Sequence, residues 1–251
     1  MQTGLTMPDS SGPRTGDDKH PKRIAGMFDA IASRYDLLNR LLSAGLDRRW
    51  RSRAIEALAL TGRETLVDVC TGTADLALAA VDRRCGGAKQ AIGIDFSEQM
   101  LVQGRDKIRR TRASGAVRLV RGDASRIPIA PEAADAVTVA FGIRNVQDPA
   151  AACADMHRVL KPGGRLAVLE FGIPRAPGLR QVYLWYFRRV LPAIGRLVSR
   201  HASAYAYLPA SVALFPDPAA FAAQLRQAGF SRVDCVHLSF GIVLLYVAQK
   251  G

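Results

Sequence analysis

Three short apolar runs of this 251-residue chain end beside carboxylates, at places where parallel strands commonly bind a ligand. The first run, VDVCTGTAD, contains Asp68 and leads into a turn with Gly72. The second run ends at Asp95 and the third at Asp123. Because the carboxyl ends of parallel strands meet at one edge of a sheet, we expect these side chains to line one site. Carboxylates there accept hydrogen bonds from ribose hydroxyls or an adenine amino group, so the pattern predicts a nucleoside site.

The turn after the first run lacks the glycines of a dinucleotide-binding fingerprint. That fingerprint requires glycine at the first, third and sixth positions, so that backbone amides approach a pyrophosphate. Here these positions hold Cys70, Gly72 and Asp75. Asp75 would lie at a helix N-terminus, where its charge repels a pyrophosphate and suits a cationic ligand such as S-adenosylmethionine. Alternatively, Asp75 only stabilises the helix dipole.

An arginine follows the fourth apolar run. The segment VTVAFGIRN spans residues 137–145 and places Arg144 and Asn145 directly after residues typical of a buried strand. An arginine that leaves a buried strand needs a partner, because an unpaired buried charge is costly. This end is therefore either a salt-bridged strand terminus or part of a site, and the sequence leaves both interpretations open.

The segments that carry these residues alternate between short β-branched runs and longer amphipathic ones. The runs predicted as strands are 64–70, 90–95, 117–123, 134–143, 164–172, 232–239 and 241–249. The segments predicted as helices between the first five strands are 74–84, 97–113 and 149–160. This order predicts an α/β fold, a Rossmann-like, seven-stranded, mostly parallel sheet with helices on both faces. Only Phe240 and Gly241 join the last two runs, so we expect a hairpin and a reversed last strand.

The region before the sheet has two parts. Residues 1–21 are rich in Gly, Pro, Ser and charge and have no apolar core, which predicts a disordered tail rather than a signal peptide. Residues 22–62 have the pattern of helices, and we expect them to cap the ligand cleft. No repeat or linker interrupts the chain after the tail, so residues 22–251 are predicted to be a single domain with its sheet core at 63–251.

The formal net charge of +13 favours an acidic partner, such as nucleic acid or an anionic membrane surface. No apolar run reaches the roughly 18 residues that a membrane-spanning helix needs, so we expect a soluble or peripheral protein. The four cysteines show no paired spacing, which favours a reducing compartment and predicts no metal site.

The segment 175–200 has six arginines and no acid among its aromatic residues. Its pattern predicts a basic amphipathic insertion that lies on an anionic membrane surface. Alternatively, it is a solvated basic face on a helix that packs on the core. The membrane interpretation predicts a cytoplasmic protein that is peripherally associated with the inner face of the membrane.

Four longer motifs resemble the ubiquinone/menaquinone biosynthesis C-methyltransferase family, over about residues 22–250. They are MFDAIASRYDLLNRLLSAGLDRRWR at 27–51, FGIRNVQD at 141–148, VLKPGGRLAVLEF at 159–171 and AYAYLPASVALFP at 204–216. The resemblance implies a class I fold, S-adenosylmethionine as cofactor and methylation of a ring carbon of a prenylated hydroquinone. The chain looks more like the menaquinone branch, in which demethylmenaquinol becomes menaquinol. The alternative substrate is a benzoquinol precursor of ubiquinone.

The resemblance also assigns residues to the cofactor site, because the family's ligand residues fall on Thr73, Asp95, Asp123 and Ala124. Ala140 stands where the family often has serine, which affects one hydroxyl contact to the cofactor. The complete predicted cofactor set is Asp68, Gly72, Thr73, Asp75, Asp95, Phe96, Asp123, Ala124 and Ala140.

Methylation at a ring carbon requires an adjacent hydroxyl to lose its proton, because the oxyanion pushes electron density into the ring. Arg144 remains protonated and cannot be the base, but Arg144 and Asn145 together can stabilise the oxyanion. The candidates for the proton acceptor are water, Tyr35, Asp36 and, with less support, Asp148 and His157. Alternatively, Tyr35 and Asp36 only pack the helical cap.

Two other classes of function also fit parts of the sequence. A nucleic-acid methyltransferase would suit the charge, but amino-group methylation of bases usually places an Asn/Asp-Pro-Pro-aromatic turn after the fourth strand, and FGIRNV is not such a turn. We therefore expect no nucleic acid as a partner. A non-catalytic scaffold in a quinone-synthesis complex is the other class, and a homodimer is compatible with the sequence.

Overall fold

The computed structural model describes residues 21–82, 87–111, 113, 115–190 and 202–251. In this part of the chain the α-helices are α1 (Pro21–Leu42), α2 (Leu46–Leu58), α3 (Asp75–Val81), α4 (Glu98–Arg109), α5 (Pro149–Val159), α6 (Pro177–Trp185), α8 (Ala202–Leu214) and α9 (Pro218–Gln227). The strands are β1 (Thr65–Val69), β2 (Gln90–Asp95), β3 (Val117–Arg121), β4 (Ala134–Ala140), β5 (Leu160–Phe171), β6 (Phe230–Leu238) and β7 (Val243–Lys250). Two 3-10 turns, η2 (Ile143–Asn145) and η4 (Ser239–Gly241), and a π-helical turn, η3 (Tyr186–Val190), complete the described elements. Of the predicted N-terminal tail, residues 1–20 lie outside the described residues.

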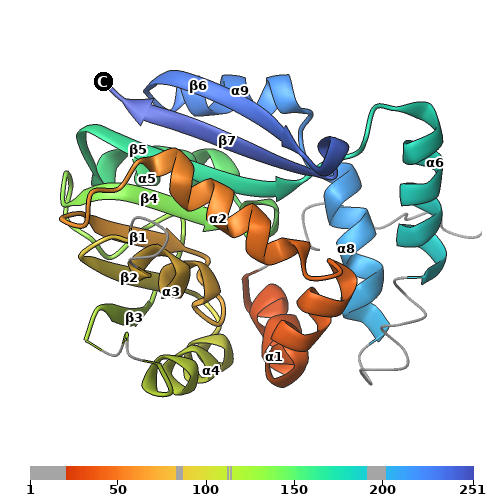
Figure 1. Cartoon of the computed structure of the whole chain (residues 1–251), viewed down its shortest axis with the longest axis horizontal. Helices are drawn as coiled ribbons and strands as arrows, with labels where there is room; N and C mark the ends of the chain where they lie inside the picture. The colour runs from red at the N-terminus through yellow and green to blue at the C-terminus, as the bar shows by residue number, and fades with distance from the viewer. Residues whose placement is uncertain (1–20, 83–86, 112, 114, 191–201) are drawn as a thin grey trace, which may run out of the picture.

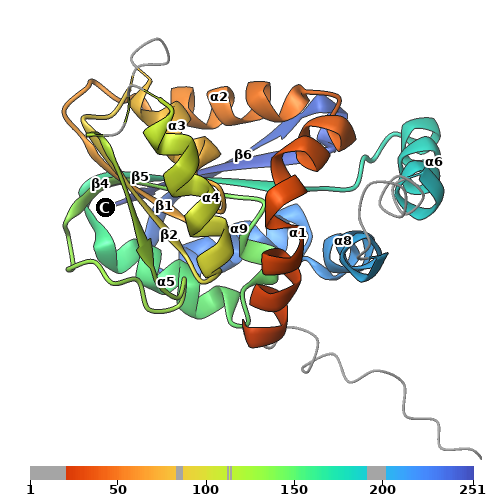
Figure 2. The ribbon, with the colours of Figure 1, turned by 90° about the horizontal axis from the view of Figure 1, so that it is seen from below.

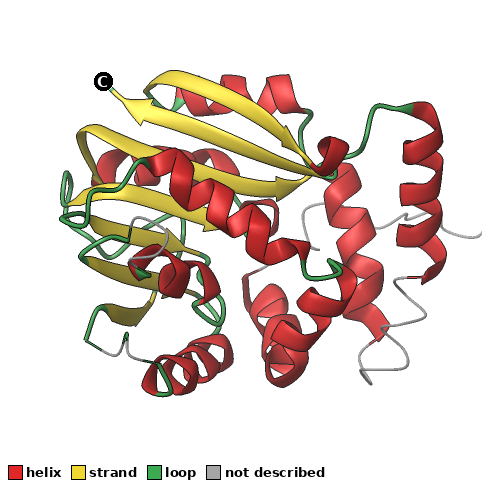
Figure 3. Ribbon diagram, in the orientation of Figure 1, coloured by secondary structure: helices red, strands yellow, loops and turns green. Residues whose placement is uncertain are grey.

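The strands form one sheet in the order β3-β2-β1-β4-β5-β7-β6 (Figures 1 and 3). Five strands, β1 to β5, pair in parallel, whereas β7 is antiparallel to both of its neighbours, β5 and β6. The predicted Rossmann-like sheet with a reversed last strand is therefore confirmed. The strand order reverses between β1 and β4, which is the place where open α/β sheets bind their ligands.

Three predicted strand boundaries differ from the structure. Strand β5 begins at Leu160 rather than at residue 164, because Leu160 pairs with Ala134 ahead of a register shift. Strand β4 ends at Ala140 rather than at residue 143, because Phe141 adopts a φ of 56° and a 3-10 turn follows. The last hairpin is joined by residues 239–242 rather than by two residues, and Phe240 there has a φ of 59°.

Helices cover both faces of the sheet (Figure 2). One face packs against α2, α3 and α4, through side chains such as Trp50, Ala77 and Ile108. The other face packs against α5 and α9, through side chains such as Met156 and Phe221. The central strand β1 is buried along almost its whole length, as expected for a parallel strand covered on both sides.

Local sequence explains where three of these helices begin. Ser97 caps α4 by accepting from the Met100 amide, and Asp148 and Asp217 cap α5 and α9 in the same way. A proline follows each of these two aspartates in the first turn, where its missing amide proton costs nothing. Of these helices, α4 and α5 start directly after the loops that carry strand-end residues.

A layer of three helices, α1, α6 and α8, lies beyond the carboxyl ends of the strands (Figure 1). The predicted cap at 22–62 is thus only partly a cap, because α2 packs along the sheet through Trp50, Ala54 and Leu58. In the basic segment, residues 177–190 are helical, and residues 191–201 lie outside the described residues. Among the described helices, none combines the length and hydropathy that crossing a membrane requires.

Candidate active site

The turn after β1 is held in a left-handed backbone conformation. Cys70, Gly72 and Ala74 have φ angles of 53°, 56° and 66°, which only glycine adopts without strain. Asp95, at the end of β2, fixes this turn, because its Oδ2 accepts from the Gly72 amide at 2.8 Å and its Oδ1 from the Ser97 amide at 2.9 Å. Burial raises the pKa of Asp95, although these amides lower it. Asp95 therefore joins two strand ends into one structure.

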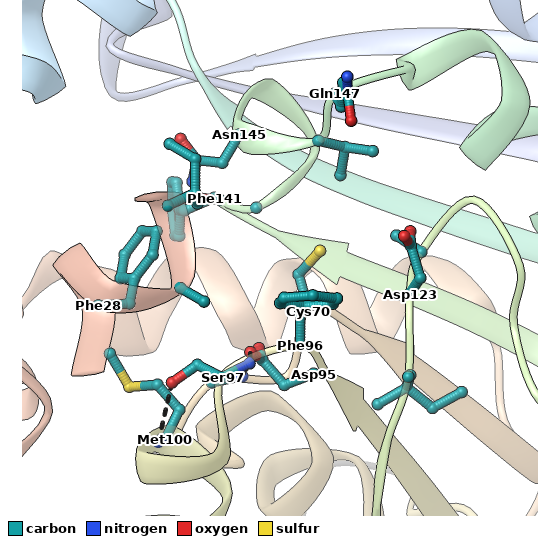
Figure 4. Close-up of a pocket in the computed structure, with 18 of the residues that line it drawn as sticks. Phe28, Cys70, Asp95, Phe96, Ser97, Met100, Asp123, Phe141, Asn145 and Gln147 are labelled. Carbon is teal, nitrogen blue, oxygen red and sulfur yellow. Dashed lines mark hydrogen bonds between the residues drawn. The ribbon is translucent and has the colours of Figure 1, made fainter. Parts of the chain in front are cut away.

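A cavity of about 180 Å³ opens where these strand ends meet, and it is named the strand-end cavity. The predicted cofactor residues that line it are Gly72, Asp95, Phe96, Asp123, Ala124 and Ala140. Figure 4 shows Asp95 and Asp123 on either side of the cavity, with Phe96 between them in this view. The structure thus brings together residues that follow different strands.

Asp123, which follows β3, lines this cavity together with the aromatic ring of Phe96, which follows β2. The Oδ1 of Asp123 accepts from the Ser125 amide at 2.8 Å and from its hydroxyl at 2.7 Å, and neither bond uses Oδ2. Phe96 is 36% exposed, and the Arg121 guanidinium lies over its ring, 5.7 Å from the centroid. A carboxylate oxygen and an exposed aromatic face suit a planar nucleobase.

Asn145 lines the strand-end cavity, although it follows Arg144 directly in the chain. Its Nδ2 donates to the Phe141 carbonyl at 3.5 Å, and its buried Oδ1 has no hydrogen-bond partner among the described residues. A buried acceptor without a partner suits a ligand that donates a hydrogen bond. The role of Asn145 as a donor to an oxyanion stays a prediction, because its Nδ2 has a second proton that this bond does not use.

A smaller cavity adjoins the strand-end cavity at the turn after β1, and it is named the turn cavity. The remaining predicted cofactor residues, Asp68, Thr73 and Asp75, line it. Asp75 forms ion pairs with Arg51 at 3.1 Å and with Lys107 at 2.6 Å. Burial opposes them, but these cations lower the pKa of Asp75. Two protein cations therefore already pair with Asp75, and its contact with a cationic ligand stays a prediction.

Asp68 is a buried support of the same turn. The hydroxyls of Thr71 and Thr138 donate to its two carboxylate oxygens at 2.6 and 2.7 Å. Burial raises the pKa of Asp68 from 3.8 to about 6, against these hydrogen bonds, which lower it. Asp68 thus ties β1 to its neighbour β4 directly below the turn.

A larger cavity of about 530 Å³ lies between α1, α2, α6 and α8, and it is named the cap cavity. Its described lining is mostly aromatic and aliphatic, and includes Phe28, Trp50 and Phe171. Tyr35 and Phe141 line the strand-end, turn and cap cavities alike. These two side chains therefore mark the boundary at which ligands in neighbouring cavities would meet.

Arg144 projects from the 3-10 turn after β4 into the wall of the cap cavity. Its Nη1 forms a 2.7 Å ion pair with the fully buried Glu170, and its Nε donates to the Ser211 hydroxyl at 3.3 Å. Its guanidinium also lies over the Phe171 ring, 5.4 Å from the centroid. The salt-bridged strand end is therefore observed, and because Arg144 also lines a cavity, its place in a functional site stays a prediction.

The two principal candidates for the base have different surroundings. Asp36 accepts from the Thr73 hydroxyl at 2.6 Å and pairs with Lys107 at 2.5 Å, and it is not among the described residues that line these three cavities. Burial raises the pKa of Tyr35, although Asn39 and nearby arginines lower it. Asp36 thus lies away from these cavities, whereas Tyr35 lines all three. The choice of either residue as the proton acceptor stays a prediction.

The two other candidates also have different positions. Asp148 lines the strand-end cavity and caps α5, where its Oδ1 accepts from the Ala151 amide at 2.9 Å. His157 packs edge-on against Phe230, with ring centroids 5.1 Å apart, and is not among the described residues of these cavities. Neither residue lines the cap cavity in the described part of the chain.

Sequence reasoning missed three residues of the site. Glu170 could have been found as the acid inside a buried strand run, VLEF, next to the strand that needs a partner for Arg144. Phe28 shares a helix face with Tyr35, seven residues later, and that spacing is present in the sequence. For Asp47 the sequence offered only its place in the motif at 27–51, and the structure is needed to show that it lines the cap cavity.

Comparison with known proteins gives the family. A family model described as the ubiE/COQ5 methyltransferase family matches residues 16–250. The chain belongs to this family. The resemblance predicted from the motifs is therefore confirmed, and so is the enzyme class.

Relatives in this family match almost the whole chain. A ubiquinone/menaquinone biosynthesis C-methyltransferase of Geobacter sp. (strain M21) is 44% identical over 229 residues, which cover 91% of this chain and 97% of the relative. A demethylmenaquinone methyltransferase of Thermus thermophilus is 45% identical over 225 residues, covering 89% of this chain and 100% of the relative.

Solved structures support the fold at much lower identity. The [4+2]-cyclase SpnF has a TM-score of 0.68 at 19% identity, covering 92% of this chain and 96% of that one. A SAM-dependent methyltransferase of Thermotoga maritima has a TM-score of 0.63 at 20% identity, covering 91% of this chain and 100% of that one. At such identities the likeness concerns the fold alone.

Proposed function

We propose that this protein transfers a methyl group from S-adenosylmethionine to a ring carbon of a prenylated hydroquinone, and that it converts demethylmenaquinol to menaquinol. The observation that carries the proposal is the contact of two unlike cavities at Tyr35 and Phe141. One cavity is lined by carboxylates that follow parallel strands, and the other is large, mostly apolar and contains a buried arginine. Family membership supports the same reaction.

The residues of the strand-end cavity fit S-adenosylmethionine. Asp95 would accept from the ribose hydroxyls and Asp123 from the adenine amino group, with Phe96 against the base. The unpartnered Oδ1 of Asn145 is a further acceptor for a ligand donor. The bound cofactor supplies an electrophilic methyl group. The protein's part is to hold the nucleoside by its strand ends, so that the reacting groups meet at the cavity boundary.

The cap cavity fits a ring with an apolar tail. Among the described residues, no hydrogen bond uses the Nη2 of Arg144, because its side-chain bonds use Nε and Nη1. Nη2 is therefore available to donate to a ring oxygen as negative charge develops there. A fixed cation in a closed apolar cavity stabilises such charge far better than it would in water.

The substrate branch rests on the relatives. The Thermus thermophilus and Bacteroides fragilis relatives are named demethylmenaquinone methyltransferases, at 45% and 39% identity. Other relatives carry a name that covers both ubiquinone and menaquinone biosynthesis. A ubiquinone-precursor benzoquinol is therefore the alternative substrate.

Product analysis tests the proposal directly. Purified protein is incubated with S-adenosylmethionine and either short-chain demethylmenaquinol or a short-chain benzoquinol precursor, and the methylated ring is identified by mass spectrometry. We expect methylation of the demethylmenaquinol. Accumulation of demethylmenaquinone in membranes after deletion of the native gene would support the same branch, and accumulation of a demethylated ubiquinone precursor would contradict it.

We also propose that the protein works at an anionic membrane surface, where its substrate is dissolved. Three apolar side chains at the rim of the cap cavity are exposed, namely Leu41 (54%), Val182 (62%) and Trp185 (61%). Arg40 and Arg180 are exposed on the same two helices, and the net charge is +13. Apolar side chains among arginines suit the interface of an anionic bilayer.

Vesicle binding tests the membrane proposal. We expect flotation with anionic vesicles at low salt, weaker flotation at high salt and little with zwitterionic vesicles. Trp185→Glu should weaken flotation, whereas Val120→Glu, on the edge strand at the other end of the sheet, should not. Flotation that ignores lipid charge, salt and Trp185→Glu would contradict the proposal.

A further inference from the structure

The proposed reaction needs a proton acceptor in the cap cavity, and among the described residues predicted for this role only Tyr35 lines it. Among the described residues that line this cavity, the only carboxylate is Asp47. Asp47 lies in the first turn of α2 and is 6% exposed. A buried carboxylate in the wall of an otherwise apolar cavity is costly and is held there by its partners.

The partners of Asp47 leave it connected to the cavity. The Ser43 hydroxyl donates to its Oδ1 at 2.9 Å, and Ser43 also lines the cap cavity. The Oδ2 accepts from Arg51 at 2.7 Å, an ion pair in which both side chains are largely buried. Arg51 therefore holds the Asp47 side chain in place, and both Ser43 and Asp47 line the cavity.

We propose that Ser43 and Asp47 form the proton acceptor for the quinol hydroxyl. This inference rests on the proposed function. The quinol O–H bond breaks, its proton passes to the Ser43 Oγ, and the proton that Ser43 held passes to the Asp47 Oδ1. The oxyanion's electrons drive the formation of the C–C bond, while the electron pair of the broken S–C bond stays on sulfur. The ring carbon then loses its proton to the ring oxygen, and Asp47 releases its proton to water.

The charges around this pair act on both ends of the transfer, because Arg144 stabilises the oxyanion whereas Arg51 stabilises the Asp47 carboxylate. Arg144 of η2 also lines the cap cavity, where it stabilises the oxyanion that the transfer creates. Arg51 pairs with Asp75 of α3 as well as with Asp47, and Tyr35 of α1 lines the same cavity. Ser43 and Asp47 thus accept a proton beside Arg51 and Arg144, which both stay charged.

A purely structural role for Asp47 is the competing explanation, because an acid in the first turn stabilises a helix. A substrate that is already ionised separates the two roles. The probes are a short-chain demethylmenaquinol and the same compound with fluorines on its second ring, which ionise the hydroxyl at the assay pH. A base is required only for the first probe.

Asp47→Asn is the main variant. We expect its turnover of the first probe to fall by about a hundredfold, the low end for general-base catalysis, and its turnover of the fluorinated probe to stay near wild type. Cofactor affinity should not change. The same loss with both probes would show that Asp47 is structural and would overturn the inference.

Two further variants keep the test decisive. Arg51→Gln breaks the same ion pair but keeps the Asp47 carboxylate. Its turnover, relative to wild type, should therefore change by the same factor with both probes. Ser43→Ala keeps Asp47 and should slow turnover of the first probe more than turnover of the fluorinated one. An equal effect on both probes would overturn the inference even if Asp47→Asn fails to fold.

A wild-type protein that methylates neither probe would instead overturn the proposed function, whereas full activity of Asp47→Asn with both probes would overturn this inference alone.

Discussion

The strand-end cavity and the cap cavity are assembled in different ways. The carboxylates of the strand-end cavity lie at or just after the ends of parallel strands, and the sheet brings them to one edge. The cap cavity draws on α1, α2, α6 and α8, which include elements far apart in the sequence that lie together only beyond the strands (Figure 1). The first is therefore a consequence of sheet topology, and the second of helix packing.

The two cavities also treat charge differently. In the strand-end cavity, the carboxylate of Asp95 accepts from two backbone amides, and Asp95 still lines the cavity. In the cap cavity, Arg144 and Asp47 each have a buried ionic partner, Glu170 and Arg51. Charge in an apolar cavity thus comes in pairs, so a substitution there affects a partner as well as the ligand. Four predictions test this difference.

The largest effect is expected at Arg144. Arg144→Ala would leave Glu170 as a buried charge without its partner, which costs about 3–5 kcal/mol and mixes folding with catalysis. The double substitution Arg144→Met and Glu170→Gln removes both charges. We expect turnover to fall by about a thousandfold, as for loss of an oxyanion-stabilising group, with cofactor affinity nearly unchanged in isothermal titration.

The matched control for this pair is Glu170→Gln alone, which keeps Arg144 and should retain much more activity than the double variant. If the double variant lost cofactor affinity as far as turnover, the two cavities would not be functionally separate.

The opposite pattern is expected at Asp95. Asp95→Ala removes the acceptor that fixes the Gly72 amide and would hold the ribose. Because hydrogen bonds to charged groups contribute about 1.5–3 kcal/mol, we expect cofactor affinity to fall by about a hundredfold, with most of the turnover restored at saturating cofactor. Isothermal titration and initial rates measure this, with Asp234→Ala on the exposed surface of β6 as control. Unchanged affinity would remove Asp95 from the cofactor site.

A smaller effect is expected at Lys107, which links the two regions. Its Nζ contacts Asp36 of α1 at 2.5 Å, and Asp75 and Thr73 of the turn at 2.6 and 2.9 Å. Lys107→Met should loosen α1 over the strand-end cavity. We expect the KM for the cofactor to rise by about tenfold and kcat to change little. The effect is limited because these ion pairs are partly exposed to solvent. Hydrogen exchange in α1 should rise as well. Arg105→Met, on the same helix and in an exposed pair, is the control.

The last prediction concerns stability and pH at Asp68 rather than activity. Its folded pKa is raised from 3.8 to about 6 by burial, so the folded state binds the proton more tightly than the unfolded state. The stability that this proton gives is complete below about pH 4 and is lost as the pH rises to about 6. Asp68→Asn should therefore remove a downward slope in unfolding free energy between about pH 4 and 6. Urea unfolding across this window measures it, and equal slopes in both proteins would contradict the prediction.

Local patterns gave clear signals for the residues that follow regular strands. Asp95 and Asp123 could be placed at one edge because alternating strands and helices already imply a parallel sheet. The same logic predicted that Arg144 needs a partner. It could not supply Glu170, because the register between β4 and β5 depends on a shift near Ala134 that no local pattern encodes.

The surroundings of residues outside this logic could not be predicted because their partners come from other elements. The partners of Asp75 and Asp36 could not be foreseen, because Arg51 and Lys107, which pair with them, lie on other helices. The burial of Tyr35 beside Phe141 depends on how α1 lies over the strand ends. Ion pairs and burial are properties of packing, and packing is not local.

The sequence by itself determined the sheet, its reversed last strand, the family and the strand-end carboxylates, because hydrophobic period and turn chemistry act over a few residues. Only the tertiary structure decided which charges are paired, where the cap cavity lies and that Ser43 and Asp47 line it. The physical reason is that these features depend on helices meeting across long sequence distances, where side-chain packing and desolvation set the geometry.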